Sequence, residues 1–191
     1  MDNYIWKLED LKSIKKNGLK VFTCFSCGGG SSMGYKLNGC EVIGNVEIDP
    51  KIMNPKYPFL MGVQEFKNIP NEKLPKELFN LDILDGSPPC STFSIAGSRE
   101  KAWGKNKKFR EGQAEQVLSD LFFDFLDVVE KLQPKIVIAE NVKGLILGNA
   151  KGYVKAIADR FKEIGYDVQL FLFNAATMGV PQLRERTFFI A

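Results

Sequence analysis

Short apolar runs alternate with amphipathic stretches along this chain. The runs are typical of buried β-strands and cover residues 19–25, 41–47, 81–86, 135–139, 168–173 and 187–191, with a shorter one near 59–63. Apolar residues at helical spacing predict helices near 31–38, over 117–132 and over 151–164. This alternation predicts one α/β domain over residues 19–191, with a mostly parallel sheet covered by helices on both faces. Residues 1–18 are expected to be a polar extension, and 91–112 a long loop.

The composition is that of an ordinary globular domain. Of 191 residues, 45% are hydrophobic and 26% charged, which argues against a disordered or collagen-like chain. No apolar run reaches the ~18 residues of a membrane helix, and the four cysteines suggest a reducing compartment, so we expect a cytoplasmic protein. The chain has no histidine, which excludes Ser-His-Asp and Cys-His catalysis and every zinc site that uses histidine.

Positive charge is concentrated in one segment of a chain whose net charge is only +3. In residues 99–110, a single acid, Glu100, stands among six cations: Arg99, Lys101, Lys105, Lys107, Lys108 and Arg110. Trp103 and Phe109 lie among them, and cations interleaved with aromatic rings suit phosphates and bases. The alternative is a solvated surface loop.

A glycine cluster follows the first predicted strand and opens a helix. Glycines at 28–30 let a ligand approach the backbone, and the helix N-terminus offers N–H donors to an anion. Glu47 ends the next strand, where a carboxylate accepts hydrogen bonds from ribose hydroxyls. This order is typical of nucleoside-cofactor binding, although the dinucleotide fingerprint G-x-G-x-x-G is not matched. The alternative is a tight turn beside a surface acid.

Cys24 and Cys27 have the C-x-x-C spacing of redox and zinc sites. The glycine turn comes after the pair, however, and Cys40 and Cys90 do not form a second close pair. We therefore predict no metal site, and interpret Cys24 and Cys40 as small core residues.

Three further segments carry candidate chemistry. Cys90 follows Pro88-Pro89 just beyond a strand end, where ligands bind in open α/β sheets, and nearby cations favour a reactive thiolate. Glu140 ends the next strand; if the two strands are neighbours, it faces the same cleft and can donate or accept a proton. Arg184 and Arg186 point the same way on a strand, as suits oxyanions. The alternatives are a buried structural cysteine, a capping acid and a salt-bridged edge strand.

Together these segments resemble the DNA cytosine-5 methyltransferase family. FSCGGGSSMG (25–34) is similar to its cofactor motif, with Cys27 and Gly28 transposed relative to the commoner F-S-G-C-G-G. GSPPCSTFSIAG (86–97) resembles the nucleophile motif, and ENVKGL (140–145) the motif whose glutamate contacts the target cytosine. The last eighteen residues, 174–191, resemble the Q-x-R-x-R motif. The motifs occur in family order.

The resemblance implies a Rossmann-like methyltransferase fold with strand order 3-2-1-4-5 and a C-terminal hairpin-like pair at the far edge. It implies S-adenosyl-L-methionine as methyl donor, a cytosine flipped out of DNA as substrate, and Cys90 as the nucleophile that attacks C6. Glu140 would bind N3 and the exocyclic amine, Arg186 would bind O2, and Arg184 would hold the backbone or support Glu140. The implied cofactor contacts are Phe25, Ser26, Gly28, Gly29, Gly30, Glu47, Ile48, Pro88 and Leu121. The implied DNA contacts are Ser91 and the six cations of 99–110.

Two departures from the family bear on these expectations. Gly62 stands where the family usually has an acid that contacts adenine. The target recognition domain and the last two family motifs are not found in residues 19–191. We therefore expect weak cofactor binding by the isolated chain, and a second chain as a possible partner. A non-catalytic remnant or split subunit, and an RNA cytosine-5 methyltransferase, stay open as alternatives.

Overall fold

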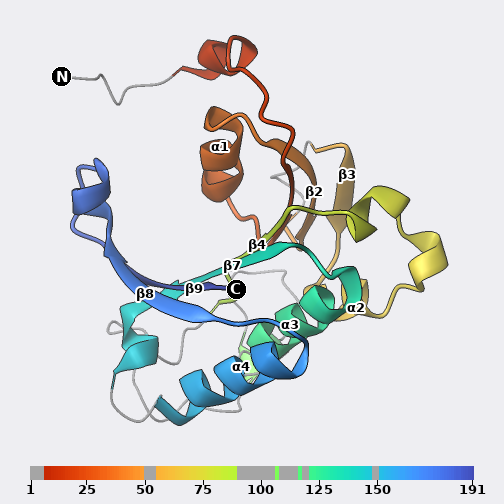
Figure 1. Ribbon diagram of the computed structural model, residues 1–191, viewed down its shortest axis with the longest axis vertical. Helices are drawn as coiled ribbons and strands as arrows, with labels where there is room; N and C mark the ends of the chain where they lie inside the picture. Colours follow the sequence, from red (N-terminus) through yellow and green to blue (C-terminus); the bar gives the residue numbers. More distant parts are fainter. Residues whose placement is uncertain (1–6, 50–54, 90–105, 108–115, 118–120, 148–150) are drawn as a thin grey trace.

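The protein is built on one seven-stranded sheet (Figure 1). The computed structural model describes residues 7–49, 55–89, 106–107, 116–117, 121–147 and 151–191. Along the sheet the strands follow the order β3-β2-β1-β4-β7-β9-β8. Their bounds are β1 Lys20–Cys24, β2 Glu41–Glu47, β3 Tyr57–Leu60, β4 Ile83–Gly86, β7 Ile136–Val142, β8 Gln169–Asn174 and β9 Glu185–Ile190.

The topology confirms the predicted strand order. The first five strands of the sheet order pair in parallel, and β9 is antiparallel to both β7 and β8, which makes the expected hairpin-like pair at the far edge. A separate two-stranded sheet pairs β5 (Asn106–Lys107) with β6 (Gln116–Val117). The predicted loop over 91–112 otherwise lies outside the described residues.

Helices lie on both faces of the sheet, as predicted. Helix α1 (Gly30–Leu37) lies on one face, whereas α2 (Val63–Lys67), α3 (Leu121–Leu132) and α4 (Lys151–Glu163) lie on the other (Figure 1). The short 3₁₀ turns are η1 Leu8–Lys12, η2 Asn71–Lys73, η3 Lys76–Phe79, η4 Lys143–Ile146 and η6 Ala175–Met178. Of the helix predicted over 117–132, the structure describes α3 over Leu121–Leu132, whereas Val117 pairs with Asn106 in the small sheet.

The main core fills the space between the sheet and helices α2, α3 and α4. Phe22, Phe122 and Phe125 are among its fully buried members, and burying such a side chain stabilises a fold by about 1.5–3 kcal/mol. A Cβ added to Gly86 would lie 2.4 Å from a ring carbon of Phe125. Glycine at the end of β4 therefore lets α3 pack directly beneath the turn that follows this strand.

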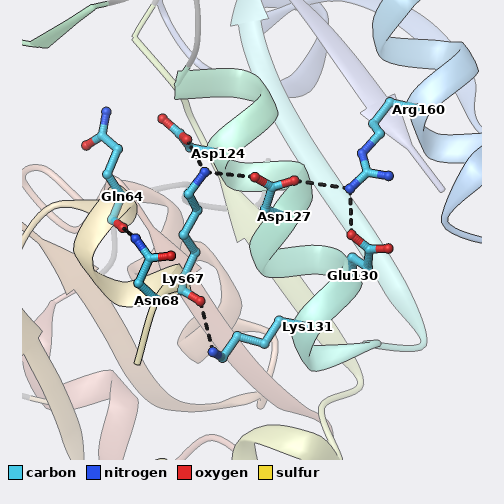
Figure 2. Close-up of polar contacts among 8 residues, drawn as sticks. All are labelled: Gln64, Lys67, Asn68, Asp124, Asp127, Glu130, Lys131 and Arg160. Atoms are coloured by element: carbon cyan, nitrogen blue, oxygen red, sulfur yellow. Dashed lines mark hydrogen bonds and ion pairs between the residues drawn. The ribbon is translucent and has the colours of Figure 1, made fainter. Parts of the chain in front are cut away.

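Ion pairs join the three helices of that face to one another (Figure 2). Lys67 of α2 contacts Asp124 at 2.6 Å and Asp127 at 2.8 Å, both on α3. Arg160 of α4 contacts Asp127 at 3.1 Å and Glu130 at 2.5 Å. Each such partly exposed pair contributes only about 1 kcal/mol or less, so the network mainly fixes the orientation of α3.

Candidate active site

The candidate site residues gather where the parallel strands end. Cys24 of β1 pairs with Gly86 of β4, which in turn pairs with Ala139 of β7. The glycine loop and the Pro88-Pro89 turn consequently leave the sheet at the same edge, as expected for neighbouring strands. Glu140 lies at this edge too, but within β7, which continues to Val142 rather than ending at Ala139. Outside the described residues lie Cys90, Ser91, Arg99, Lys101, Lys105, Lys108 and Arg110. Lys107 is described only as part of the β5 backbone.

The turn that leads to Cys90 is held by both neighbouring strand ends. Asn141, which is 3% exposed, donates from Nδ2 to the carbonyl of Pro88 at 3.1 Å, and its Oδ1 accepts the N–H of Val142 at 2.8 Å. On the other side, Ser87 donates to the carbonyl of Phe25 at 3.2 Å. Asn141 was missed as a functional residue, although it directly follows Glu140 in the motif.

Glu140 forms an ion pair with Arg186 across the antiparallel pair of β7 and β9. Arg186 Nε lies 2.8 Å from Glu140 Oε1, and the two side chains are 23% and 29% exposed. Burial raises the pKa of Glu140, while the charges of Arg186 and Arg184 oppose this rise. The ion pair with Glu140 is thus made by Arg186, whereas the resemblance gave Arg184 the role of holding the backbone or supporting Glu140. Arg184 is exposed, and its carbonyl accepts the N–H of Ala175 at 2.9 Å.

The glycine loop contains two non-glycine residues in the left-handed backbone region. Phe25 has φ +58° and Cys27 has φ +42°. A left-handed conformation costs an L-residue roughly 1–2 kcal/mol. The transposition of Cys27 and Gly28 therefore places a side chain where the commoner family order has glycine, whereas Gly28 itself does not have a positive φ.

We expect the Cys27→Gly substitution to stabilise the protein by roughly 1 kcal/mol, because it relieves the left-handed strain and loses part of this gain to a more flexible unfolded chain. Urea unfolding of both proteins measures the difference. Gly28→Ala is the control for the unfolded-chain effect alone: its added Cβ meets nothing within 4 Å, so it should stabilise the protein by about 0.4–1 kcal/mol. A Cys27→Gly protein no more stable than the parent would show that the loop carries no such strain.

Glu47 connects the end of β2 to the glycine loop. Its Oε2 accepts the N–H of Cys27 at 2.7 Å, and its Oε1 accepts those of Ile48 and Asp49 at 2.8 Å and 3.0 Å. The side chain is 7% exposed. A carboxylate has about four lone-pair sites. The three backbone N–H donors therefore leave one lone-pair site of Glu47 for a ligand hydroxyl.

The other predicted cofactor residues belong to the strand ends and to the start of α3. Phe25 and Ile48 follow the ends of β1 and β2, Pro88 is buried, and Leu121 is fully buried at the start of α3. A Cβ placed on Gly28, Gly29 or Gly30 meets nothing within 4 Å, so the backbone there is approachable. Ser26 Oγ lies 2.7 Å from Thr23 Oγ1. This arrangement fits a nucleoside ligand with a carboxylate group at the N-terminus of α1.

Among the described residues, no three histidine, cysteine, aspartate or glutamate side chains cluster so that they could hold a metal ion. Cys24 and Cys40 are buried, whereas Cys27 is exposed. Within the same part of the chain, no helix has the length and apolar character needed to cross a membrane.

Known proteins share both the sequence pattern and the fold. A family model for C-5 cytosine-specific DNA methylases matches residues 19–191. The type II methyltransferase M.NgoPII of Neisseria gonorrhoeae is 31% identical over 180 residues, which cover 91% of this chain and 48% of the relative. M.FnuDI of Fusobacterium nucleatum is 33% identical over 175 residues, 90% of this chain and 46% of the relative. The chain thus spans about half the length of these curated relatives.

Solved structures agree with the fold. A prophage-encoded protein from E. coli, described as a DNA modification methyltransferase, aligns with a TM-score of 0.66 at 25% identity, over 91% of this chain and 46% of its own. Spodoptera frugiperda DNMT2 aligns with a TM-score of 0.58 at 21% identity, over 91% of this chain and 49% of its own, and supports the fold alone.

Proposed function

The chain belongs to the C-5 cytosine-specific DNA methylase family, and we propose that it carries the catalytic part of an enzyme that methylates cytosine at C5 in DNA. The observation that carries this proposal is the strand register. It sets the Glu140–Arg186 pair beside the turn that leads to Cys90. A DNA substrate also fits the cytoplasmic location expected from the cysteine content.

The proposed reaction begins with the Cys90 thiolate forming a bond to C6 of a cytosine flipped out of the duplex. The electron pair this displaces makes C5 nucleophilic; S-adenosylmethionine, when bound at the glycine loop and Glu47, would supply the methyl group and leave as S-adenosylhomocysteine. Glu140 donates a hydrogen bond or proton at N3, which stabilises the charge that develops on the ring. Loss of the C5 proton and cleavage of the S–C6 bond then restore the aromatic ring and free Cys90.

Arg186 has two roles in the proposed reaction. Its Nε holds the Glu140 carboxyl, and its Nη1 donates to the carbonyl of Glu185 at 2.8 Å, so the guanidinium is oriented from two sides. We propose that its remaining N–H groups reach O2 of the cytosine. Target recognition is assigned to the part of the relatives that this chain does not span, on the same polypeptide or on a second chain.

Calorimetric titration with S-adenosylhomocysteine tests the cofactor site without a substrate sequence. We expect a saturable isotherm of one ligand per chain, and no heat from homocysteine alone, because the ribose and adenine contacts are then lost. A chain that binds neither ligand, although circular dichroism shows it folded, would favour a non-catalytic module over the proposed enzyme.

Replacing Glu47 by alanine should weaken S-adenosylhomocysteine binding by ~1–3 kcal/mol, the scale for losing hydrogen bonds to a charged group. The loss combines the ribose contact with the anchor that Glu47 provides to Cys27 of the glycine loop. The same titration measures it. Glu41→Ala is the matched control, since Glu41 is exposed at the other end of β2. Equal affinities of the two variants would place Glu47 outside the cofactor site.

A further inference from the structure

A second buried carboxylate lies close to Glu140, and the proposed reaction does not use it. Asp85 of β4 is 8% exposed. Its Oδ2 accepts the hydroxyl of Ser31 at 2.6 Å, and its Oδ1 accepts that of Tyr35 at 3.1 Å. Both donors come from α1, so this helix holds the carboxyl group in a fixed place on its face of the sheet.

The strand register places Asp85 beside Glu140. Asp85 pairs with Ile138 of β7, and alternate residues of a strand share a face, so Glu140 lies on the same face as Asp85, one step further toward the strand ends. Ile138 also packs in the same small cluster as Tyr35, which confirms that this is the α1 face. Tyr35, Asp85, Glu140 and Arg186 therefore form a polar row that leads from α1 to β9.

The charge of Glu140 acts on Asp85 within this row, and an electrostatic interaction between two titrating groups is a property of the pair. Burial raises the pKa of Asp85 to about 6, and the negative charge of Glu140 adds to this rise, while the hydrogen bonds from Ser31 and Tyr35 oppose it. Burial, followed by the charge of Asp85, raises the pKa values of Tyr35 and of Cys24 on β1, so both groups stay protonated.

Two further described charges act on Glu140. Arg186 of β9 and Arg184, which directly precedes β9, oppose the rise of its pKa. Two carboxyl groups that interact in this way titrate as a pair rather than independently.

We infer that Asp85 is a positioning residue for the proposed reaction: its negative charge favours the protonated form of Glu140, the acid assigned to cytosine N3. The effect of Asp85 on catalysis rests on the proposed function, whereas its effect on Glu140 rests on the buried cluster that Asp85 forms with Ser31 and Tyr35. Ser31 and Tyr35 keep Asp85 ionised near neutral pH by donating to its carboxylate, and α1, which begins at the glycine loop, thereby also acts on the catalytic acid.

The coupling is measured directly by carboxyl ¹³C NMR titration of the full chain, with Glu140→Gln used to assign the Glu140 signal. In the parent protein we expect the Glu140 signal to show a second step near pH 6, where Asp85 ionises. Asp85→Asn should remove this step. Asp82→Asn should keep it, because Asp82 lies at the opposite end of β4 and pairs with Lys135 at 2.7 Å.

The titration of Asp85 in a Glu140 variant tests the same coupling if Asp85→Asn fails to fold. Glu140 is partly exposed, and its replacement by glutamine should lower the titration midpoint of Asp85 below about 6, because one of the causes that raise it is removed. An unchanged Asp85 midpoint, or a Glu140 curve that is the same with and without Asp85, would overturn the inference.

A pH profile of covalent adduct formation separates positioning from mere structural support. The ratio of the parent rate to the Asp85→Asn rate should grow as pH rises through about 6, since the Asp85 carboxyl group of the parent protein becomes ionised in this range. A constant ratio at every pH would mean that Asp85 only supports the fold. The NMR titration needs neither DNA nor Cys90, so failure of the proposed function and failure of this inference give different results.

Discussion

Replacing Cys90 by serine is expected to abolish the covalent adduct with DNA that contains 5-fluorocytosine. Fluorine cannot leave C5 as a cation, so the parent enzyme stalls with its S–C6 bond intact and accumulates the adduct. A serine hydroxyl at neutral pH is a far weaker nucleophile than a partly ionised thiol. The adduct is measured by denaturing electrophoresis and mass spectrometry, using this chain supplied with the C-terminal part of a relative such as M.FnuDI.

Cys27→Ser is the matched control for this experiment. Cys27 is exposed and lies in the neighbouring glycine loop, so it tests whether any accessible thiol of the site suffices. We expect its adduct to form as in the parent, and likewise that of Cys24→Ser, because burial keeps the Cys24 thiol protonated. An adduct that persists in Cys90→Ser and disappears in Cys27→Ser would mean that the nucleophile has been assigned to the wrong residue.

Glu140→Gln should slow adduct formation by ~100-fold or more, the usual scale for loss of a general acid. The substitution keeps the size of the side chain but removes both the transferable proton and the charge that Arg186 contacts at 2.8 Å. Single-turnover rates of adduct formation, measured at saturating DNA, give the effect.

Glu185→Gln provides the comparison for Glu140→Gln. Glu185 lies in β9 next to Arg186 and forms its own ion pair with Lys143 at 2.7 Å, with similar partial exposure. Its loss should therefore leave the rate nearly unchanged. If both substitutions slowed the reaction to the same extent, the effect would come from the general charge balance of the sheet edge rather than from Glu140 as an acid.

Most of the fold could be predicted from local patterns. The apolar run over 41–47 coincides with β2, because most of that run is buried in the middle of the sheet. The pattern over 151–164 differs from α4 by one residue, because its buried residues, Ile157 and Phe161, recur at helical spacing. The strand pairing of Val117 could not be predicted in this way. Val117 continues the helical spacing but pairs with Asn106, eleven residues earlier, in a separate sheet.

The same distinction between local patterns and long-range contacts holds for the chemistry of the site. Sequence alone indicated which residues reach the sheet edge, because a strand end and the residues that follow it are local features: Glu140 and Glu47 lie there as expected, and the turn that leads to Cys90 starts from the same edge. Only the tertiary structure decided that Arg186 pairs with Glu140, that Asn141 holds Pro88, and that α1 buries Asp85. These contacts join residues 46 to 54 positions apart, and they depend on the register between strands and on helix packing, which no short-range periodicity encodes.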